Sequence, residues 1–196
     1  SIVIDGKAQI ELDSNIDGHD LLAPSVAIHT IGAGGGSVTE FKSGKINVGP
    51  RSASSIPGPI CYDHGGTEIT ITDANLVLGR ISKKLSFGND IKLNYEETSS
   101  KMNELGEKLK LSGNQVAEGI IKIADGNMSN AIRELTVFRG LDPRDYALMA
   151  FGGAGPLHTV ALAEELGIST VIVPANAGVL SAWGMLQADY RVDKSI

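Results

Sequence analysis

The first part of the chain alternates apolar and polar residues with the two-residue period of β-strands. Residues 2–10 do so around Asp5-Gly6, a dipeptide typical of a tight β-hairpin turn. A second hairpin is predicted over 38–48, with its turn at Lys42-Ser43-Gly44. Residues 26–31 and 67–72 have the pattern of single strands. The first 80 residues are therefore expected to be mainly β-structure and loops.

A helical period begins at residue 98 and defines a helical region over 98–139. Met102, Leu105 and Leu109 share one face, and Gly113 marks a break. Ser112 and Gln115 have the spacing of a capping box. An apolar stripe then continues as one long helix towards Gly140, through Val116, Ile120, Ile123, Met128, Ile132 and Leu135. Glycine is unfavourable inside a helix, so Gly119 and Gly126 suggest that another element packs closely there.

The last part of the chain, 146–188, has the pattern of a β-α-β unit. The expected elements are a buried strand over 146–151, a glycine loop over 152–156, a helix over 157–166, a second strand over 170–173 and a helix over 179–188. Such strands are parallel and joined by a right-handed crossover. The fold class is therefore α/β.

Residues 32–80 are expected to form a loop region rich in glycine and proline. Nine of the 24 glycines fall between residues 32 and 66, with three of the seven prolines. A short helix is expected to end near Leu78, capped by Thr72 or Asp73.

The first glycine-rich loop, Gly34, Gly35, Gly36 and Ser37, is a candidate phosphate or substrate loop, because glycine lets backbone N–H groups approach an anion. It matches neither the dinucleotide fingerprint nor the P-loop, since Ser37 and Thr39 stand where glycines are required. A tight bend without a ligand remains the alternative.

The second glycine-rich loop contains Gly152, Gly153, Ala154 and Gly155. It lies between a buried strand and a helix, where ligands of open α/β sheets bind. A turn that only allows strand and helix to pack closely is the alternative. His158 follows at the start of the helix, where it either reaches a ligand or faces solvent.

Other polar residues are weaker candidates. Glu68 and Asp73 flank a predicted strand end and would hold a metal or orient water, although capping explains Asp73 equally well. His29 would have to join Asp17, His19 and Asp20 in a transition-metal site, but the spacing matches no compact ligand motif.

A partial calcium-loop pattern runs from Asp13 to Gly18. Pro24 occupies the position of the bidentate Glu, so tight calcium binding is not expected. No serine nucleophile elbow is present, and the sequence assigns no catalytic base.

The amino-acid composition argues against two classes of function. The 196 residues contain 42% hydrophobic residues, carry a formal net charge of -6, and have no long apolar run and no basic cluster. Membrane-spanning and nucleic-acid-binding roles are not expected. The single Cys61 is expected to be a small buried side chain and fits a reducing compartment, so a cytoplasmic location is predicted.

Several segments together closely resemble the hydantoinase A/5-oxoprolinase family. They are Ile28 to Ser37, Gly49 to Ala53, Pro57 to Tyr62, Gly65 to Glu68, Thr72 to Arg80, Ala150 to His158 and Gly178 to Gly184. The resemblance covers nearly the whole chain and is weakest between Ser82 and Ser112.

The resemblance implies an actin-like ATPase (ribonuclease H-like) fold, of which this chain would be the C-terminal portion. It implies ATP and a divalent metal, expected to be Mg, as cofactors, and the loop Gly152 to Gly155 as the adenosine contact. Partners would be the upstream part of the same chain, a hydantoinase B-type subunit or domain, and a small cyclic amide. The family couples ATP hydrolysis to opening a hydantoin or 5-oxoproline ring by placing phosphate on the carbonyl oxygen.

Two alternatives stay open. The chain would belong to a subunit of an ATP-dependent ketone carboxylase of the same family, or would be a non-catalytic assembly module with an actin-like fold. Because the chain begins inside a hairpin, it is expected to be a fragment that is inactive alone.

Overall fold

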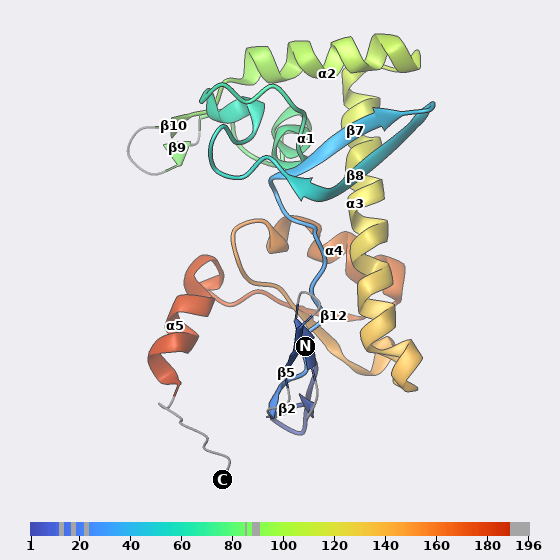
Figure 1. The fold of residues 1–196 in the computed structure, drawn as a ribbon, viewed down its shortest axis with the longest axis vertical. Helices are drawn as coiled ribbons and strands as arrows, with labels where there is room; N and C mark the ends of the chain where they lie inside the picture. The colour runs from blue at the N-terminus through green and yellow to red at the C-terminus, as the bar shows by residue number, and fades with distance from the viewer. Residues whose placement is uncertain (12–13, 17–18, 22–23, 85, 88–90, 189–196) are drawn as a thin grey trace.

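The computed structural model describes residues 1–11, 14–16, 19–21, 24–84, 86–87 and 91–188. Figure 1 shows two groups of elements, with α3 (Gly113–Leu135) running along one side of both. One group contains the hairpin of β7 and β8 with α1 and α2, and the other contains α4, β12 and α5 with the N-terminal hairpins. The long helix is therefore the element common to both.

The N-terminal segment forms small antiparallel pairs. β1 (Val3–Ile4) pairs with β2 (Lys7–Ala8), and the turn residues Asp5 and Gly6 both have positive φ, as the sequence predicted for a tight hairpin. β3 (Ile10–Glu11) pairs with β6 (Ser25–Val26), and β4 (Ser14–Ile16) with β5 (His19–Leu21). The predicted strand over 26–31 was wrong beyond Val26, because residues 27–31 form an extended connection without strand pairing.

The second hairpin is longer than predicted. β7 (Ser37–Lys42) pairs with β8 (Lys45–Ser52), with a register irregularity between Ser37 and Thr39. A further small hairpin joins β9 (Ser86–Phe87) to β10 (Ile91–Lys92). The hairpin of β7 and β8 places Val48 in the main core.

The predicted strand over 67–72 was wrong, because helix α1 (Ile71–Val77) already begins there. Only Thr70 forms a bridge, with Val38 of β7. The N-cap is Thr70 rather than Thr72 or Asp73, and Asp73 is its partner at the third helical position of a capping box. Ile71 and Thr72 continue the alternating pattern of the preceding residues, but they are helical because the capping box fixes the start of α1 at this point.

The helical region is two helices. α2 (Tyr95–Leu109) begins three residues earlier than expected, and its N-cap is Asn94. Ser112 and Gln115 form the predicted capping box of α3. The main core lies between β8, α1, α2 and α3; its buried members include Val48, Ile71, Ala74, Met102, Val116, Ala117, Ile120, Ile121 and Ala124.

The C-terminal part confirms the β-α-β unit, but its strands are shorter than predicted and its first helix begins two residues earlier, at Gly155. The first strand was predicted to be buried, which is wrong here, because Ala147 and Met149 are exposed. β11 (Ala147–Met149) and β12 (Thr170–Ile172) are parallel, with Leu148 opposite Val171, and α4 (Gly155–Leu166) connects them. α5 (Leu180–Gln187) follows. Short 3-10 turns occur at Ile60–Tyr62, Val137–Arg139, Pro143–Asp145 and Ala177–Val179.

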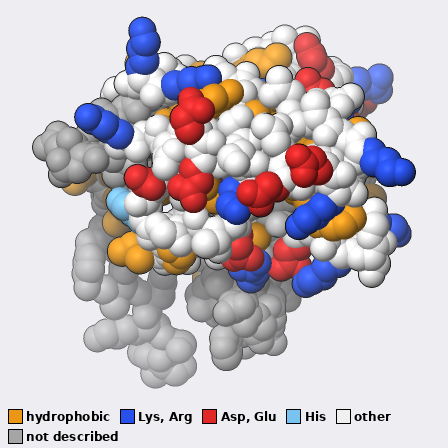
Figure 2. Space-filling model, turned by 90° about the horizontal axis from the view of Figure 1, so that it is seen from above, with side chains coloured by type: hydrophobic (Ala, Val, Ile, Leu, Met, Phe, Trp, Pro, Cys, Tyr) orange, Lys and Arg blue, Asp and Glu red, His pale blue; other side chains and the backbone are white. Residues whose placement is uncertain are grey.

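None of the described helices is long and apolar enough to cross a membrane. Figure 2, seen from the end that carries α2, shows Lys and Arg interspersed with Asp and Glu on this face. Such mixing produces no strong field of one sign there.

The two helical glycines of α3 do not mark close contacts, contrary to the sequence-based expectation. A Cβ placed at Gly119 or Gly126 would meet no described atom within 4 Å. The tight position is instead Gly106 in α2, where a Cβ would lie 2.5 Å from the carbonyl oxygen of Leu111. The chain therefore reverses closely against α2 before α3 begins.

This difference predicts opposite effects of the same substitution. Gly119→Ala and Gly126→Ala should each raise the free energy of unfolding by up to about 1 kcal/mol, because alanine is the better helix former. Gly106→Ala should lower it, because the new methyl group has no room. Urea unfolding of the three variants measures this, and a destabilised Gly119→Ala would contradict the open surface found at that position.

Candidate functional site

The two glycine-rich loops predicted separately from the sequence come together. A Cβ placed at Gly35 would lie 3.8 Å from the Cβ of Ala154 and 2.6 Å from the hydroxyl oxygen of Thr72. The first loop therefore lies between the second loop and the beginning of α1. Only a residue without a side chain fits at Gly35.

The carbonyl groups in and next to the first loop accept hydrogen bonds from other groups of the protein. The Ser37 hydroxyl accepts from the N–H of Gly34 at 2.9 Å and donates to the carbonyl of Gly32 at 3.3 Å. The carbonyl of Gly35 accepts from the N–H and the hydroxyl of Thr72, at 2.9 and 2.8 Å. The carbonyl of Gly36 accepts from the N–H of Ala53 at 2.8 Å.

These bonds leave a different set of groups available to a ligand. Within the part of the chain that the structure describes, no hydrogen bond occupies the N–H groups of Gly35 and Gly36. The buried Ser37 hydroxyl fixes the loop and is not presented to solvent. A loop with its carbonyls tied down and its N–H groups unused is suited to an anion.

The second loop has the same character. The N–H of Gly152 donates to the carbonyl of Ala177 at 2.8 Å, which ties the loop to the turn before α5. The N–H groups of Gly153 and Ala154 make no hydrogen bond to described atoms, and a Cβ at Gly153 would meet none within 4 Å. The loop thus exposes backbone at the N-terminus of α4, the end of a helix that favours negative charge.

Asp73 lies behind the first loop and is fully buried. Its carboxylate accepts from the N–H and hydroxyl of Thr70, each at 2.8 Å, from the N–H of Cys61 at 2.8 Å and from the N–H of Ile60 at 3.3 Å. Of the two explanations that the sequence left open for Asp73, capping is the one the structure shows. Both carboxylate oxygens accept hydrogen bonds that fix the start of α1.

His158 does not face solvent, which corrects one of the two alternatives left open for it. The ring is 1% exposed, and Nδ1 lies 2.6 Å from Oδ1 of Asp125 on α3. Its Nε2 is buried without a hydrogen-bond partner among the described atoms. The pair joins the first turn of α4, directly after the second glycine loop, to the middle of α3.

Glu68 takes no part in the hydrogen bonds to Asp73 and belongs to a surface network of charged side chains. Arg51 binds both oxygens of Glu68 and one oxygen of Glu40, and Lys42 lies 2.5 Å from Glu40. Hydrogen bonds from Arg51 to Glu68, and from Lys42 and Arg51 to Glu40, hold the pKa of both carboxyl groups below its usual value. These charges pair with each other.

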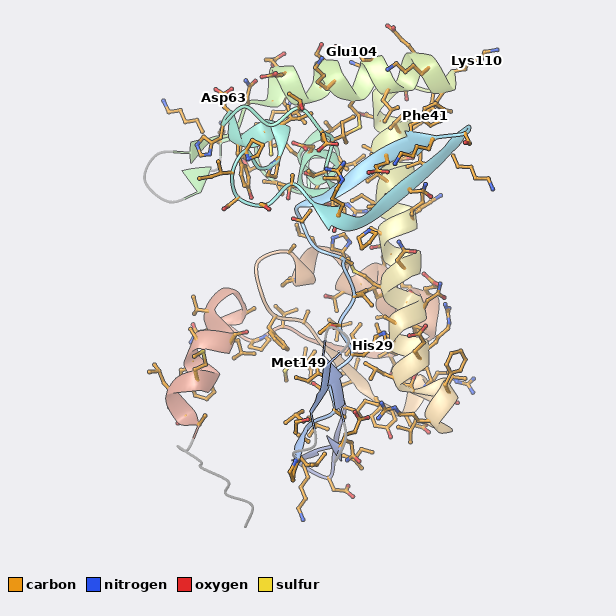
Figure 3. All side chains as sticks on the ribbon, in the orientation of Figure 1. His29, Phe41, Asp63, Glu104, Lys110 and Met149 are labelled. Carbon is orange, nitrogen blue, oxygen red and sulfur yellow. The ribbon has the colours of Figure 1, made fainter. Side chains whose placement is uncertain are left out.

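The metal-site predictions gain no support from the described residues. His29 forms an ion pair with Glu134 at 3.0 Å on α3, and Figure 3 shows it on the connection that leads up to the first glycine loop. Asp17 and the ends of the Asp13 to Gly18 loop lie outside the described residues. In the described ranges no three His, Cys, Asp or Glu side chains converge on a possible metal position.

Comparison with known proteins identifies the family of the chain. The Hydantoinase/oxoprolinase family matches residues 1–194. The chain belongs to this family.

Relatives within the family carry different names. Caprolactamase subunit alpha of Pseudomonas jessenii is 39% identical over 96% of this chain and 27% of its own length, and 5-oxoprolinase 1 of Arabidopsis thaliana is 37% identical over 96% of this chain and 16% of its own. This chain therefore spans about a quarter or less of these family members.

Solved structures give the same relationship. The crystal structure of the ATP-dependent caprolactamase from Pseudomonas jessenii superimposes with a TM-score of 0.82 at 40% identity, covering 89% of this chain and 26% of that one. The nucleotide-free acetone carboxylase structure, from a study of ATP-dependent acetone carboxylation, superimposes with a TM-score of 0.87 at 32% identity, covering 97% of this chain and 28% of that one. At these identities the likeness extends beyond the fold to the family.

Sequence reasoning missed two side chains at this candidate site. Thr72, which holds Gly35, was considered only as a helix cap. Asp125, the partner of His158, lies in the long helix, and its one usable signal was a charged residue between Ile121 and Ile132 on the buried side of α3. Contacts between elements 33 residues apart leave no local pattern.

Cys61 is expected to be chemically silent in the folded protein. It is fully buried, and both burial and the nearby Asp73 carboxylate raise the pKa of its thiol, so the thiol stays protonated at neutral and mildly alkaline pH. A thiol reagent at pH 8 should label it only after unfolding by urea. Rapid labelling of the native protein would show that the cluster around Asp73 opens in solution.

The Asp125 and His158 pair should contribute strongly to stability. His158→Leu leaves the buried Asp125 carboxylate without its donor and should cost about 3 kcal/mol or more, whereas Asp125→Asn keeps an acceptor for Nδ1 and should cost less. Chemical unfolding of both variants measures the difference. Equal, small losses would mean that water replaces the ring at little cost.

Proposed function

We propose that this chain forms the nucleotide-handling part of an ATP-dependent enzyme that opens a cyclic amide of the hydantoin or 5-oxoproline type. The observation that carries the proposal is the meeting of the two glycine loops at Gly35 and Ala154. Their unused N–H groups form one backbone surface suited to the phosphates and the adenosine of ATP. The fold in this proposal is the actin-like ATPase fold, with residues 146–188 as its nucleotide-binding unit.

The second loop is assigned to the adenosine. Gly152 has a φ of 84°, so it holds a conformation that favours glycine, while Gly153 leaves open space above the backbone. The first loop, Gly34 to Ser37, is assigned to phosphate or to the substrate carbonyl next to it. Both assignments use main-chain atoms, which agrees with the absence of Lys and Arg from the two loops.

ATP use has a chemical reason. An amide carbonyl is a poor electrophile, and transfer of the γ-phosphoryl group to its oxygen, with release of ADP, makes the carbon open to attack by water. Positioning and electrostatic stabilisation by preorganised N–H groups are what such a transfer requires. The described side chains near the loops do not supply a metal site of their own, so no step is assigned to an ion held by this chain.

A ketone carboxylase is the second candidate. The TM-score of 0.87 to acetone carboxylase, over 97% of this chain, favours it as much as the caprolactamase structure favours an amidase. Both candidates need the same ATP-binding loops, and both would use a second subunit, as the name of the caprolactamase alpha subunit suggests. Assaying the intact protein with lactams, hydantoin, 5-oxoproline and acetone separates the two.

Gly153→Val tests the adenosine assignment. A Cβ at this position meets no described protein atom within 4 Å, so we expect the variant to keep the fold and to weaken ATP binding at least about tenfold by filling ligand space. Gly119→Val is the matched control, because it also adds a side chain over open space but on α3, away from the loops. Nucleotide titration of the intact protein measures the effect, and unchanged ATP affinity in a folded Gly153→Val would refute the assignment.

A further inference from the structure

A hollow of about 510 Å³ lies beside the first glycine loop. One side is formed by Gly32 and Ala33, and the opposite walls by the hairpin of β7 and β8 and by Ile123 and Asn127 of α3. This volume is in the range of small-molecule sites and exceeds what a five- to seven-membered ring needs. The hollow is lined by Gly32, whose carbonyl accepts a hydrogen bond from the Ser37 hydroxyl of the proposed phosphate loop.

The walls combine apolar surface with two carboxamides and one carboxylate. Ile31, Pro50 and Ile123 supply the apolar surface. Asn47 and Asn127 supply the carboxamides, and Glu40 the carboxylate. No Lys, Arg or His is among the lining residues, so the hollow itself offers no cation to a phosphate or a carboxylate.

The two cations that contact Glu40 are paired with carboxylates. Arg51 is bound by Glu68 and Glu40, and Lys42 by Glu40. These two cations and two carboxylates sum to zero charge. An anionic ligand in the hollow would therefore find the Glu40 carboxylate in the wall and no Lys, Arg or His among the lining residues.

The carboxamides match the polar edge of a cyclic amide. A lactam or hydantoin holds its N–H and C=O on the same side of the C–N bond, and a carboxamide side chain offers the complementary acceptor and donor. Asn127 donates to the carbonyl of Val48 at 3.4 Å, a long bond that leaves its oxygen free to accept. The Asn47 side chain, exposed on β8, makes no hydrogen bond to described atoms.

We propose that this hollow binds the ring of a neutral cyclic amide and selects it against an anionic one such as 5-oxoproline. The inference rests on the proposed function and adds the charge class of its substrate. Asn47 and Asn127 form hydrogen bonds with the N–H and C=O groups of the cyclic amide, and the apolar walls contact its ring. Glu40, paired with Arg51 and Lys42, lies in the wall and disfavours an anion. The ring's carbonyl then lies on the side of the first glycine loop.

Two ligands that differ by one carboxylate test this. 2-Pyrrolidinone and 5-oxoproline share a five-membered lactam ring, and only the second is an anion. In the intact protein, ligand-detected NMR and ATP-dependent turnover should both favour 2-pyrrolidinone by about tenfold or more. Binding is measured without turnover, so loss of the proposed activity and failure of the hollow are distinguishable.

Glu40→Gln provides the decisive variant. It removes one carboxylate from the balanced network and leaves one net positive charge beside the hollow, so relative binding of 5-oxoproline should rise by about threefold to tenfold. Glu107→Gln, the same change at an exposed site on α2, is the control and should alter neither ligand. Asn127→Leu should weaken 2-pyrrolidinone binding in a protein with an unchanged thermal midpoint.

Each result decides the proposal. A preference for 2-pyrrolidinone that Glu40→Gln reduces and Asn127→Leu abolishes supports it. Tighter binding of 5-oxoproline by the wild type, or equal ligand binding by the wild type and Asn127→Leu, overturns it. If 2-pyrrolidinone binds as expected but ATP-dependent hydrolysis of every cyclic amide is absent, the proposed function fails while the hollow's selectivity stands.

Discussion

The buried carboxylate of Asp73 is the interaction on which the upper half of the molecule depends. It receives four hydrogen bonds from Thr70, Ile60 and Cys61, so it starts α1 and fixes the 3-10 turn Ile60–Tyr62 at the same time. A carboxylate at the N-terminus of a helix also meets the favourable end of the helix dipole. Because α1 starts where it does, Thr72 reaches the carbonyl of Gly35.

The position of the first glycine loop follows from this start. Thr72, Ser37 and Ala53 donate hydrogen bonds to carbonyl groups of this loop and of Gly32, whereas the N–H groups of Gly35 and Gly36 make no hydrogen bond to described atoms. α3 connects the hairpin to the second glycine loop. Its residues contact β8 through Asn127 and α4 through Asp125, so one rigid helix determines the separation between the hairpin and the second loop.

Local patterns predicted the elements whose ends are marked by short-range chemistry. The Asp5-Gly6 turn, the Ser112 and Gln115 box and the parallel β-α-β unit are of this kind. The strand predicted over 67–72 was wrong because the capping box of Thr70 and Asp73 starts a helix at Ile71, and an alternating pattern of six residues does not reveal such a start. The glycine loops could be named as candidates, but their contact could not, since it joins residues 119 positions apart.

The two glycine loops and the neighbouring hollow differ in the groups that they present to a ligand. The two glycine loops present main-chain N–H groups, which every residue but proline carries, so their recognition of a ligand depends on conformation and on the lack of Cβ atoms. The neighbouring hollow is lined by side chains whose charge and hydrogen-bonding groups change with a single substitution. On the functions proposed above, a family built this way keeps one ATP site and alters its substrate at the hollow.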